Sequence, residues 1–186
     1  KFPPLLEISD DLGAALTDID LIVCAVPTSG FRQILKSING INQSATVIWA
    51  NKGLEQGSAK LPHEIALEEL GDPKDTNRHW GLVSGPSFAA ELVRSLPTAL
   101  TLASTSKETT ALAANSFHHH NLRVYTSQDV VGASVGGALK NVIAIASGIS
   151  DGMGFGNNAR AALITRGLAE ISRFGFHLGA NQETFS

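Results

Sequence analysis

The sequence has little cysteine, little charge and no long apolar run. Cys24 is the only cysteine among 186 residues, so no internal disulfide can form, and we expect a reducing compartment, the cytoplasm. With 14 basic and 17 acidic residues, the net charge of -3 gives no electrostatic footprint for nucleic acid or for an anionic membrane surface. Uninterrupted apolar runs such as residues 21–26 are far shorter than the ~20 residues of a membrane span, and no signal peptide is recognisable. Because 43% of the residues are hydrophobic and 17% are charged, we expect a soluble, folded protein.

Apolar strands alternate with helical segments as far as Tyr125. The pattern predicts strands over residues 20–26, 46–50, 81–84, 99–103 and 122–125, and helices over 12–16, 28–38, 62–70, 88–94 and 107–117. Ser9, Thr28 or Ser29, and Ser127 are the expected helix caps. Strands that are apolar on both faces predict a mainly parallel sheet that helices cover on both sides.

The pattern becomes entirely helical after Tyr125. Helices are expected from Asp129 to about Ser150 and from Asn158 to Leu178, and the glycine-rich run 152–156 is interpreted as their connection. We therefore predict an α/β unit over residues 1–127 and the beginning of an all-helical unit over 128–186. A doubly wound nucleotide-binding sheet usually opens with a strand, a glycine-rich turn and a helix. Nothing at the N-terminus matches that pattern, so we expect a fragment or a longer protein of which these residues are part.

Three loops, at residues 27–30, 51–53 and 84–87, follow predicted strands, at the edge of the sheet where ligands of open α/β folds bind. Lys52 stands directly after the second strand, beside Gly53, and it is either an anion contact or a solvated turn lysine. Gly85 and Ser87 follow the third strand and precede a helix, whose N-terminal amides attract phosphate or carboxylate. An ordinary capped helix start explains the same residues.

Lys140 lies in the middle of an otherwise apolar helix. Gly136, Gly137 and Ala144 flank it by one turn, so a ligand or another backbone can approach the helix there. A desolvated lysine has a lowered pKa that suits a general acid or base, and Asn141 beside it can orient a hydroxyl. The alternative is a lysine that extends from the edge of a tightly packed helix pair towards water.

Other candidates carry weaker signals. His118, His119 and His120 lack a carboxylate or cysteine at metal-ligand spacing, so we expect no metal site. Arg160 could reach an anion, whereas Arg166 is expected to form structural ion pairs.

Six motifs in one order resemble the bacterial NAD(P)-dependent glycerol-3-phosphate dehydrogenase family, and the similarity extends over essentially the whole chain. They are residues 49–55 (WANKGLE), 84–89 (SGPSFA), 96–99 (LPTA), 136–144 (GGALKNVIA), 150–152 (SDG) and 158–168 (NARAALITRGL).

The resemblance implies an oxidoreductase that interconverts dihydroxyacetone phosphate and sn-glycerol 3-phosphate with NAD or NADP, for phospholipid synthesis. It implies an incomplete Rossmann domain over 1–127 and the beginning of a helical substrate-binding domain over 128–186, which in this family often supports homodimers.

The resemblance also implies the roles of six residues. Lys140 matches the catalytic lysine, with Asn141 as the active-site asparagine, and Lys52 matches a contact to both substrate and cofactor. Gly85 and Ser87 match substrate contacts, and Ala89 matches a cofactor contact through its backbone.

The family's opening glycine-rich turn, and a later segment that binds phosphate and cofactor, have no counterpart in these residues. If they are the whole polypeptide, we expect no catalysis by the chain alone. A related β-hydroxyacid dehydrogenase and a non-catalytic fragment are the alternative interpretations.

Overall fold

A five-stranded mixed sheet forms the N-terminal part of the computed structural model, which describes residues 3–76 and 78–185. The strands lie in the order β1-β2-β3-β4-β5: β1 (Leu21–Cys24), β2 (Thr46–Trp49), β3 (Trp80–Ser84), β4 (Thr98–Ala103) and β5 (Leu122–Ser127). The pairs β1–β2, β2–β3 and β4–β5 are parallel, which confirms the mainly parallel sheet. The pair β3–β4 is antiparallel, with Ser84 opposite Thr101. A parallel crossover needs a connecting segment that spans the sheet, and α4 (Ala89–Val93), the helix between these strands, has only five residues.

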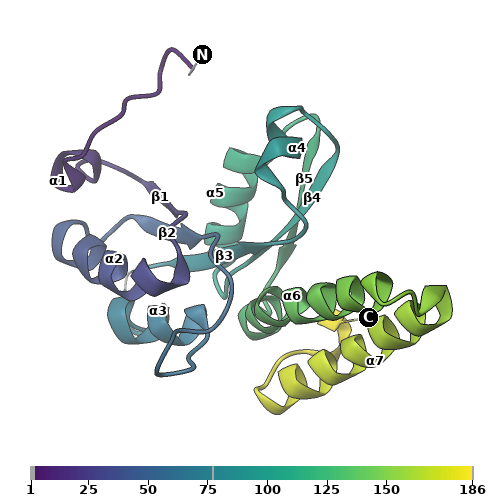
Figure 1. Ribbon diagram of the computed structural model, residues 1–186. Helices are drawn as coiled ribbons and strands as arrows, with labels where there is room; N and C mark the ends of the chain where they lie inside the picture. Colours follow the sequence, from purple (N-terminus) through teal and green to yellow (C-terminus); the bar gives the residue numbers. More distant parts are fainter. Residues whose placement is uncertain (1–2, 77, 186) are drawn as a thin grey trace.

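Helices cover both faces of the sheet, as expected (Figure 1). On one face, α2 (Thr28–Ile41) and α3 (Pro62–Leu70) pack their buried residues, such as Phe31 and Ile65, against Val47 and Trp49. On the other face, α5 (Lys107–Phe117) packs Ala113 against residues of β2, β3 and β4. The buried aliphatic and aromatic side chains fix α2 and α3 relative to the strands, because close-packed interiors leave little room for rearrangement.

All three predicted hydroxyl caps were wrong. The short α1 (Leu12–Ala15) is capped by Asp11, and α6 (Val130–Gly152) is capped by Asp129, whose carboxylate accepts from the Gly132 amide. Ser9 and Ser127 each accept from the amide two residues later, that of the capping aspartate. A carboxylate directly before the helix is an equally good cap, and here it is two positions closer to the free amides than the predicted serine. At α2 the cap residue is Pro27, with no side-chain cap.

Two long helices follow the sheet, α6 and α7 (Gly156–His177), and the 3-10 turn η1 (Gln182–Phe185) packs against both. Residues 153–155 connect the two helices, which confirms the connection predicted for the glycine-rich run. Arg166 pairs with Glu170 as predicted. Arg160 contacts Asp151 and Asn157 at the turn between the helices.

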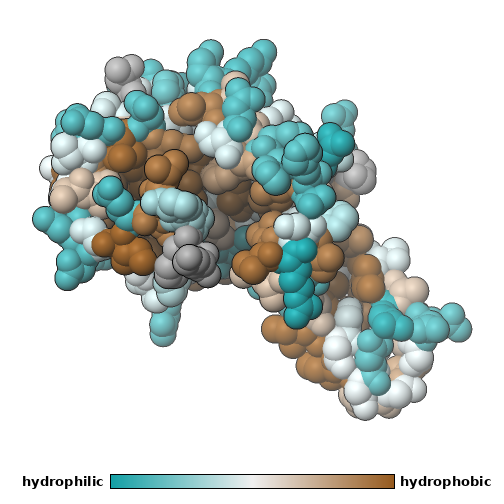
Figure 2. All heavy atoms as spheres, turned by 90° about the horizontal axis from the view of Figure 1, so that it is seen from above, coloured by the Kyte–Doolittle hydropathy of each residue, from teal (hydrophilic) through white to brown (hydrophobic). Residues whose placement is uncertain are grey.

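Helix α6 is long and apolar enough to cross a membrane by length and composition, the one such helix in the described part of the chain. Uninterrupted apolar runs do not single this helix out, because glycines, serines and Lys140 interrupt its apolar residues. A third of its most apolar window is buried, and core helices of soluble proteins pass the same test, so the finding is weak evidence for a membrane span. Apolar side chains of the helix pair also reach the surface, among them Ile145, Ile149, Met153 and Phe155. Figure 2 shows that brown, apolar patches are exposed on the face that it draws.

Candidate functional site

A cavity of about 370 Å³ lies between the ends of β2 and β3 and the middle of α6. Its lining residues are Lys52, Gly85, Pro86, Ser87, Phe88, Lys140, Asn141 and Ala144. Five of the six residues singled out from the sequence therefore share one cavity, although Lys52 and Lys140 lie far apart in the chain. The sixth, Ala89, is the exposed first residue of α4, directly after Phe88, and is not part of the lining.

The Lys140 ammonium contacts the loop that follows β3. Its Nζ donates a hydrogen bond to the Gly85 carbonyl oxygen at 2.9 Å. The side chain therefore turns back onto the protein. The alternative interpretation, a lysine that extends into water, does not fit this contact. Burial lowers the pKa of Lys140 below its ordinary value, because desolvation disfavours the charged form.

Gly85 is a position that only glycine suits. Its φ of +139° lies in a region that other residues rarely adopt, and a Cβ there would stand 2.8 Å from the Ala99 carbonyl oxygen. The loop therefore passes close over β4. The same close passage brings the Gly85 carbonyl oxygen to Lys140.

Lys52 brings a second amine to the cavity. Its Nζ donates to the Ala50 carbonyl oxygen at 2.9 Å, and the side chain is half-buried, which does not fit a freely solvated turn lysine. Burial lowers the pKa of Lys52, and the positive charge of Lys140 lowers it further. Two neighbouring cations with lowered pKa values make the cavity favourable for an anion.

Gly137 explains how the Lys52 chain reaches this place. A Cβ at Gly137 would lie 3.0 Å from Ser84 Oγ and 3.6 Å from Lys52 Cγ, so the absence of a side chain lets both approach the helix. The small residue one turn before Lys140 thus has the role that the sequence predicted for it, the close approach of another group.

The helix predicted after Ser87 is shorter than expected. Helix α4 begins at Ala89, with Phe88 at the cap position and no side-chain cap. Its five residues have a small dipole, so anion binding by this helix end contributes less than the sequence suggested. Ser87 lines the cavity from the loop instead.

Sequence reasoning missed one residue near the site. Asp129 is buried, and its carboxylate accepts from the Gly132 amide at 2.8 Å, the Asn181 amide at 2.9 Å and the Thr184 hydroxyl at 2.5 Å, which ties the start of α6 to η1. It borders a larger hollow of about 760 Å³ that shares Gly85 with the first cavity. An aspartate immediately before an apolar helix was the available signal. Thr28 lies in the predicted loop 27–30 that the sequence singled out, and its hydroxyl donates to the Lys52 carbonyl oxygen, a contact that the sequence did not predict.

The histidine triplet lies apart from the cavity. His118, His119 and His120 are exposed after α5, near Arg123. Within residues 3–76 and 78–185, no group of three or more His, Cys, Asp or Glu residues is arranged to hold a metal ion.

Comparison with curated proteins gives close relatives. A protein of Methylobacillus flagellatus named glycerol-3-phosphate dehydrogenase (NAD(P)+) is 62% identical over 184 residues, which cover 99% of this chain and 55% of that protein. A protein of the same name from Nitrosospira multiformis is 51% identical, over 98% of this chain and 54% of its own length. The chain thus spans about half the length of the curated relatives that it matches.

Solved structures agree with the sequence comparison. Glycerol-3-phosphate dehydrogenase from Coxiella burnetii matches with a TM-score of 0.89 and 38% identity, over 98% of this chain and 55% of that one. The enzyme from Saccharomyces cerevisiae matches with a TM-score of 0.81 and 31% identity, over 95% and 52%.

Family models cover both parts of the chain. The model described as NAD-dependent glycerol-3-phosphate dehydrogenase N-terminus matches residues 1–110, and its C-terminus counterpart matches 129–186. On these matches, the chain belongs to the NAD-dependent glycerol-3-phosphate dehydrogenase family.

Proposed function

We propose that this chain carries the catalytic part of an oxidoreductase that interconverts dihydroxyacetone phosphate and sn-glycerol 3-phosphate with NAD or NADP. One observation supports this most directly: Lys140 Nζ is fixed on the Gly85 carbonyl oxygen in a cavity that Lys52 and Ser87 also line. The cavity offers a proton donor and an anion contact side by side, which the reduction of a phosphorylated ketone requires. Membership of the family supports the same reaction.

Lys140 is the proposed proton donor. When bound, a nicotinamide cofactor would supply the hydride that the reduction of C2 of dihydroxyacetone phosphate needs. The Lys140 ammonium gives one proton to the C2 oxygen, so the C=O bond becomes CH–OH and the amine is left neutral. In the opposite direction the neutral amine accepts the hydroxyl proton. Burial favours the neutral amine and lowers the pKa of Lys140, so the proton leaves more readily than from an exposed lysine.

The other residues bind and orient. Lys52 is the proposed contact to the substrate and to the cofactor, Gly85 and Ser87 contact the substrate, and Asn141 orients the reacting hydroxyl. The missing side chains at Gly85 and Gly137 let the loop after β3 and the Lys52 side chain pack closely around the cavity, so that Lys52 and Lys140 can both face a three-carbon phosphate. Ala89 would contact the cofactor through its backbone, from the start of α4.

The same proposal covers organisation and setting. We infer that residues 1–127 belong to the dinucleotide-binding domain and 128–186 to the substrate-binding domain, because β5 ends at Ser127 and α6 begins at Val130. The free, buried thiol of Cys24 is consistent with the cytoplasm. A homodimer and a supply of glycerol phosphate for phospholipid synthesis complete the proposal, on the family resemblance.

The test is an activity assay on the protein purified as the cell makes it. Dihydroxyacetone phosphate is added, and turnover is measured as the loss of NADH or NADPH absorbance. Lys140→Met should abolish turnover and leave cofactor binding nearly unchanged, because it removes the proton donor without changing the fold. Lys107→Met, at the exposed start of α5, is the matched control and should keep wild-type turnover. Retained turnover in Lys140→Met would exclude the proposed role. A preference for non-phosphorylated hydroxyacids would indicate a different β-hydroxyacid dehydrogenase.

A further inference from the structure

Helix α2 holds the loop that carries Lys52 at two points. We define the Lys52 loop as residues 51–60, between β2 and α3. The Thr28 hydroxyl donates to the Lys52 carbonyl oxygen at 2.9 Å. Arg32 donates from Nε and Nη2 to the two carboxylate oxygens of Glu55, both at 2.8 Å. Thr28 and Arg32 are four positions apart, so they lie on one face of α2, and both point at the loop.

The Arg32–Glu55 contact is stronger than an ordinary surface ion pair. The two hydrogen bonds are parallel and charge-assisted, and the Glu55 side chain is 16% exposed. Ser58 also donates to the Glu55 carboxylate, at 2.5 Å. The Arg32 guanidinium and the Ser58 hydroxyl together lower the pKa of Glu55 to about 2, so the carboxylate is charged at any physiological pH.

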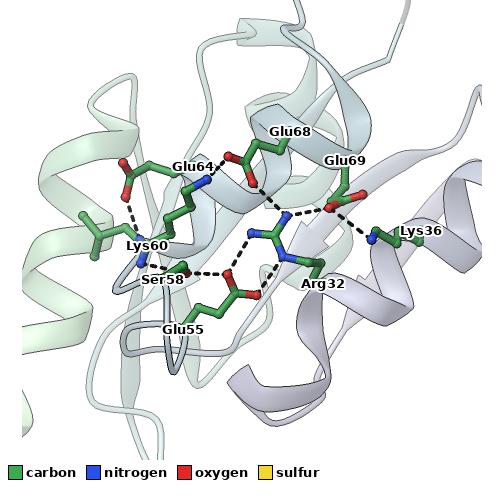
Figure 3. Close-up of polar contacts among 9 residues, drawn as sticks. Arg32, Lys36, Glu55, Ser58, Lys60, Glu64, Glu68 and Glu69 are labelled. Carbon is green, nitrogen blue, oxygen red and sulfur yellow. Dashed lines mark hydrogen bonds and ion pairs between the residues drawn. The ribbon is translucent and has the colours of Figure 1, made fainter.

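The guanidinium is itself held by α3. Arg32 Nη1 donates to Glu68 at 2.7 Å and to Glu69 at 2.5 Å, as Figure 3 shows. Lys60 contacts Glu68 and Lys36 lies 3.9 Å from Glu69, so three carboxylates face three cations. The cluster therefore links the Lys52 loop to two helices whose buried faces are fixed on the sheet.

Anchoring the loop backbone also sets where the Lys52 amine lies. The Lys52 side chain passes along Gly137 and ends in a hydrogen bond with the Ala50 carbonyl oxygen, so it spans a short, defined path from its own backbone. A shift of the loop therefore moves the amine relative to Lys140, which is fixed on a different loop.

We propose that Thr28, Arg32 and Glu55 form a clamp that positions Lys52 in the site; the proposal rests on the proposed function for the role of Lys52. These three are positioning residues, which act on substrate only through Lys52. The simpler alternative is that the cluster only stabilises the fold. The two explanations differ in what happens to Lys52 when the loop contacts are removed and the helix contacts are kept.

Two matched pairs of variants separate these explanations. Thr28→Val removes the hydroxyl and keeps the shape, and Thr28→Ser keeps the hydroxyl. Glu55→Gln weakens the link from Arg32 to the loop, and Glu69→Gln weakens a link from the same guanidinium to α3. All four are made in the protein as the cell produces it, and all are measured well below their melting temperatures.

Two readouts are taken from each variant. The first is the apparent pKa of Lys52, from the pH dependence of its acetylation by acetic anhydride followed by mass spectrometry, which needs no activity. The second is KM for dihydroxyacetone phosphate against kcat. The clamp predicts that Thr28→Val and Glu55→Gln raise the Lys52 pKa towards its ordinary value, because a released amine is better hydrated. It also predicts a rise in KM of about fivefold, the equivalent of one lost hydrogen bond, whereas Thr28→Ser and Glu69→Gln match the wild type.

Each outcome decides between the explanations. An unchanged Lys52 pKa in Thr28→Val and Glu55→Gln, with lowered melting temperature alone, would show a purely structural cluster and overturn the clamp. Equal effects from Glu55→Gln and Glu69→Gln would do the same. If Glu55→Gln does not fold, Thr28→Val decides. A changed Lys52 pKa without turnover in any form, the wild type included, would support the clamp and refute the proposed function instead.

Discussion

Replacement of Gly85 by alanine should damage the fold and the site together. The φ of this residue is +139°, and an alanine Cβ would stand 2.8 Å from the Ala99 carbonyl oxygen and 3.3 Å from Leu100 Cα. Both neighbours are backbone atoms of β4, which cannot turn aside as a flexible side chain can. The loop must therefore move away from β4, and the Gly85 carbonyl oxygen that receives Lys140 Nζ must move with it.

The expected cost has two contributions. A backbone conformation of this kind costs about 1–3 kcal/mol for a residue with a side chain, and the overlap with β4 adds about 1–3 kcal/mol. For a chain of this size, each 1 kcal/mol lowers the melting temperature by about 2–4 °C, so a fall of roughly 4–24 °C is expected. Turnover should fall by about a hundredfold if Lys140 is displaced by about 1 Å.

Thermal unfolding and steady-state kinetics of Gly85→Ala check both numbers. Gly154→Ala is the matched control, because Gly154 also has a positive φ, +71°, but has open space around its missing Cβ. The control should lose about 1–2 kcal/mol and keep its turnover. A Gly85→Ala protein with the stability of the control and wild-type kinetics would refute both the close passage over β4 and the anchoring of Lys140.

The remaining predictions concern charge and packing. Because the pKa of Glu55 is about 2 in the folded protein and about 4.3 in an unfolded chain, its contribution to stability is complete above pH ~5 and is lost as the pH falls from ~5 to about 2. In this pH range the free energy of unfolding of Glu55→Gln should fall less steeply with pH than that of the wild type. Equal slopes for the two proteins in acid denaturation would contradict the bidentate pair. Lys140→Met should raise the pKa of Lys52, since the Lys140 charge is one cause of its lowering; the pH dependence of Lys52 acetylation measures this, and no change would place the two amines too far apart to interact. Phe31→Ala should cost about 3–5 kcal/mol, because the side chain is fully buried against Trp49; chemical denaturation measures it, and a loss below 1 kcal/mol would contradict the packing of α2.

The sequence predicted helices and strands well where the spacing of apolar residues and the residues at the ends of an element indicated the same bounds. Helices α3 and α5 have the bounds read from the sequence, 62–70 and 107–117, because apolar spacing marks the length of both and Pro62 stands at the start of α3. The direction of β4 could not be read in the same way. Strand direction depends on how the preceding connection packs, and a five-residue helix leaves the same apolar pattern in either direction.

In the candidate site, too, one part could be predicted from local sequence and another part could not. Lys140 could be found from its own helix, because a lysine among glycines and aliphatic residues is unusual whatever the rest of the fold does. Its hydrogen-bond acceptor could not be found, since the Gly85 carbonyl oxygen lies 55 positions away and a backbone oxygen leaves no mark in a sequence. The contacts of Arg32 with Glu55 and Glu69 span 23 and 37 positions and depend on how α2, α3 and the Lys52 loop meet. Residue chemistry therefore marks the groups that can react, whereas the contacts that hold those groups in place depend on tertiary packing. Substitutions that keep every motif residue and change only Thr28 or Arg32 thus test the part of the site that the motifs do not encode.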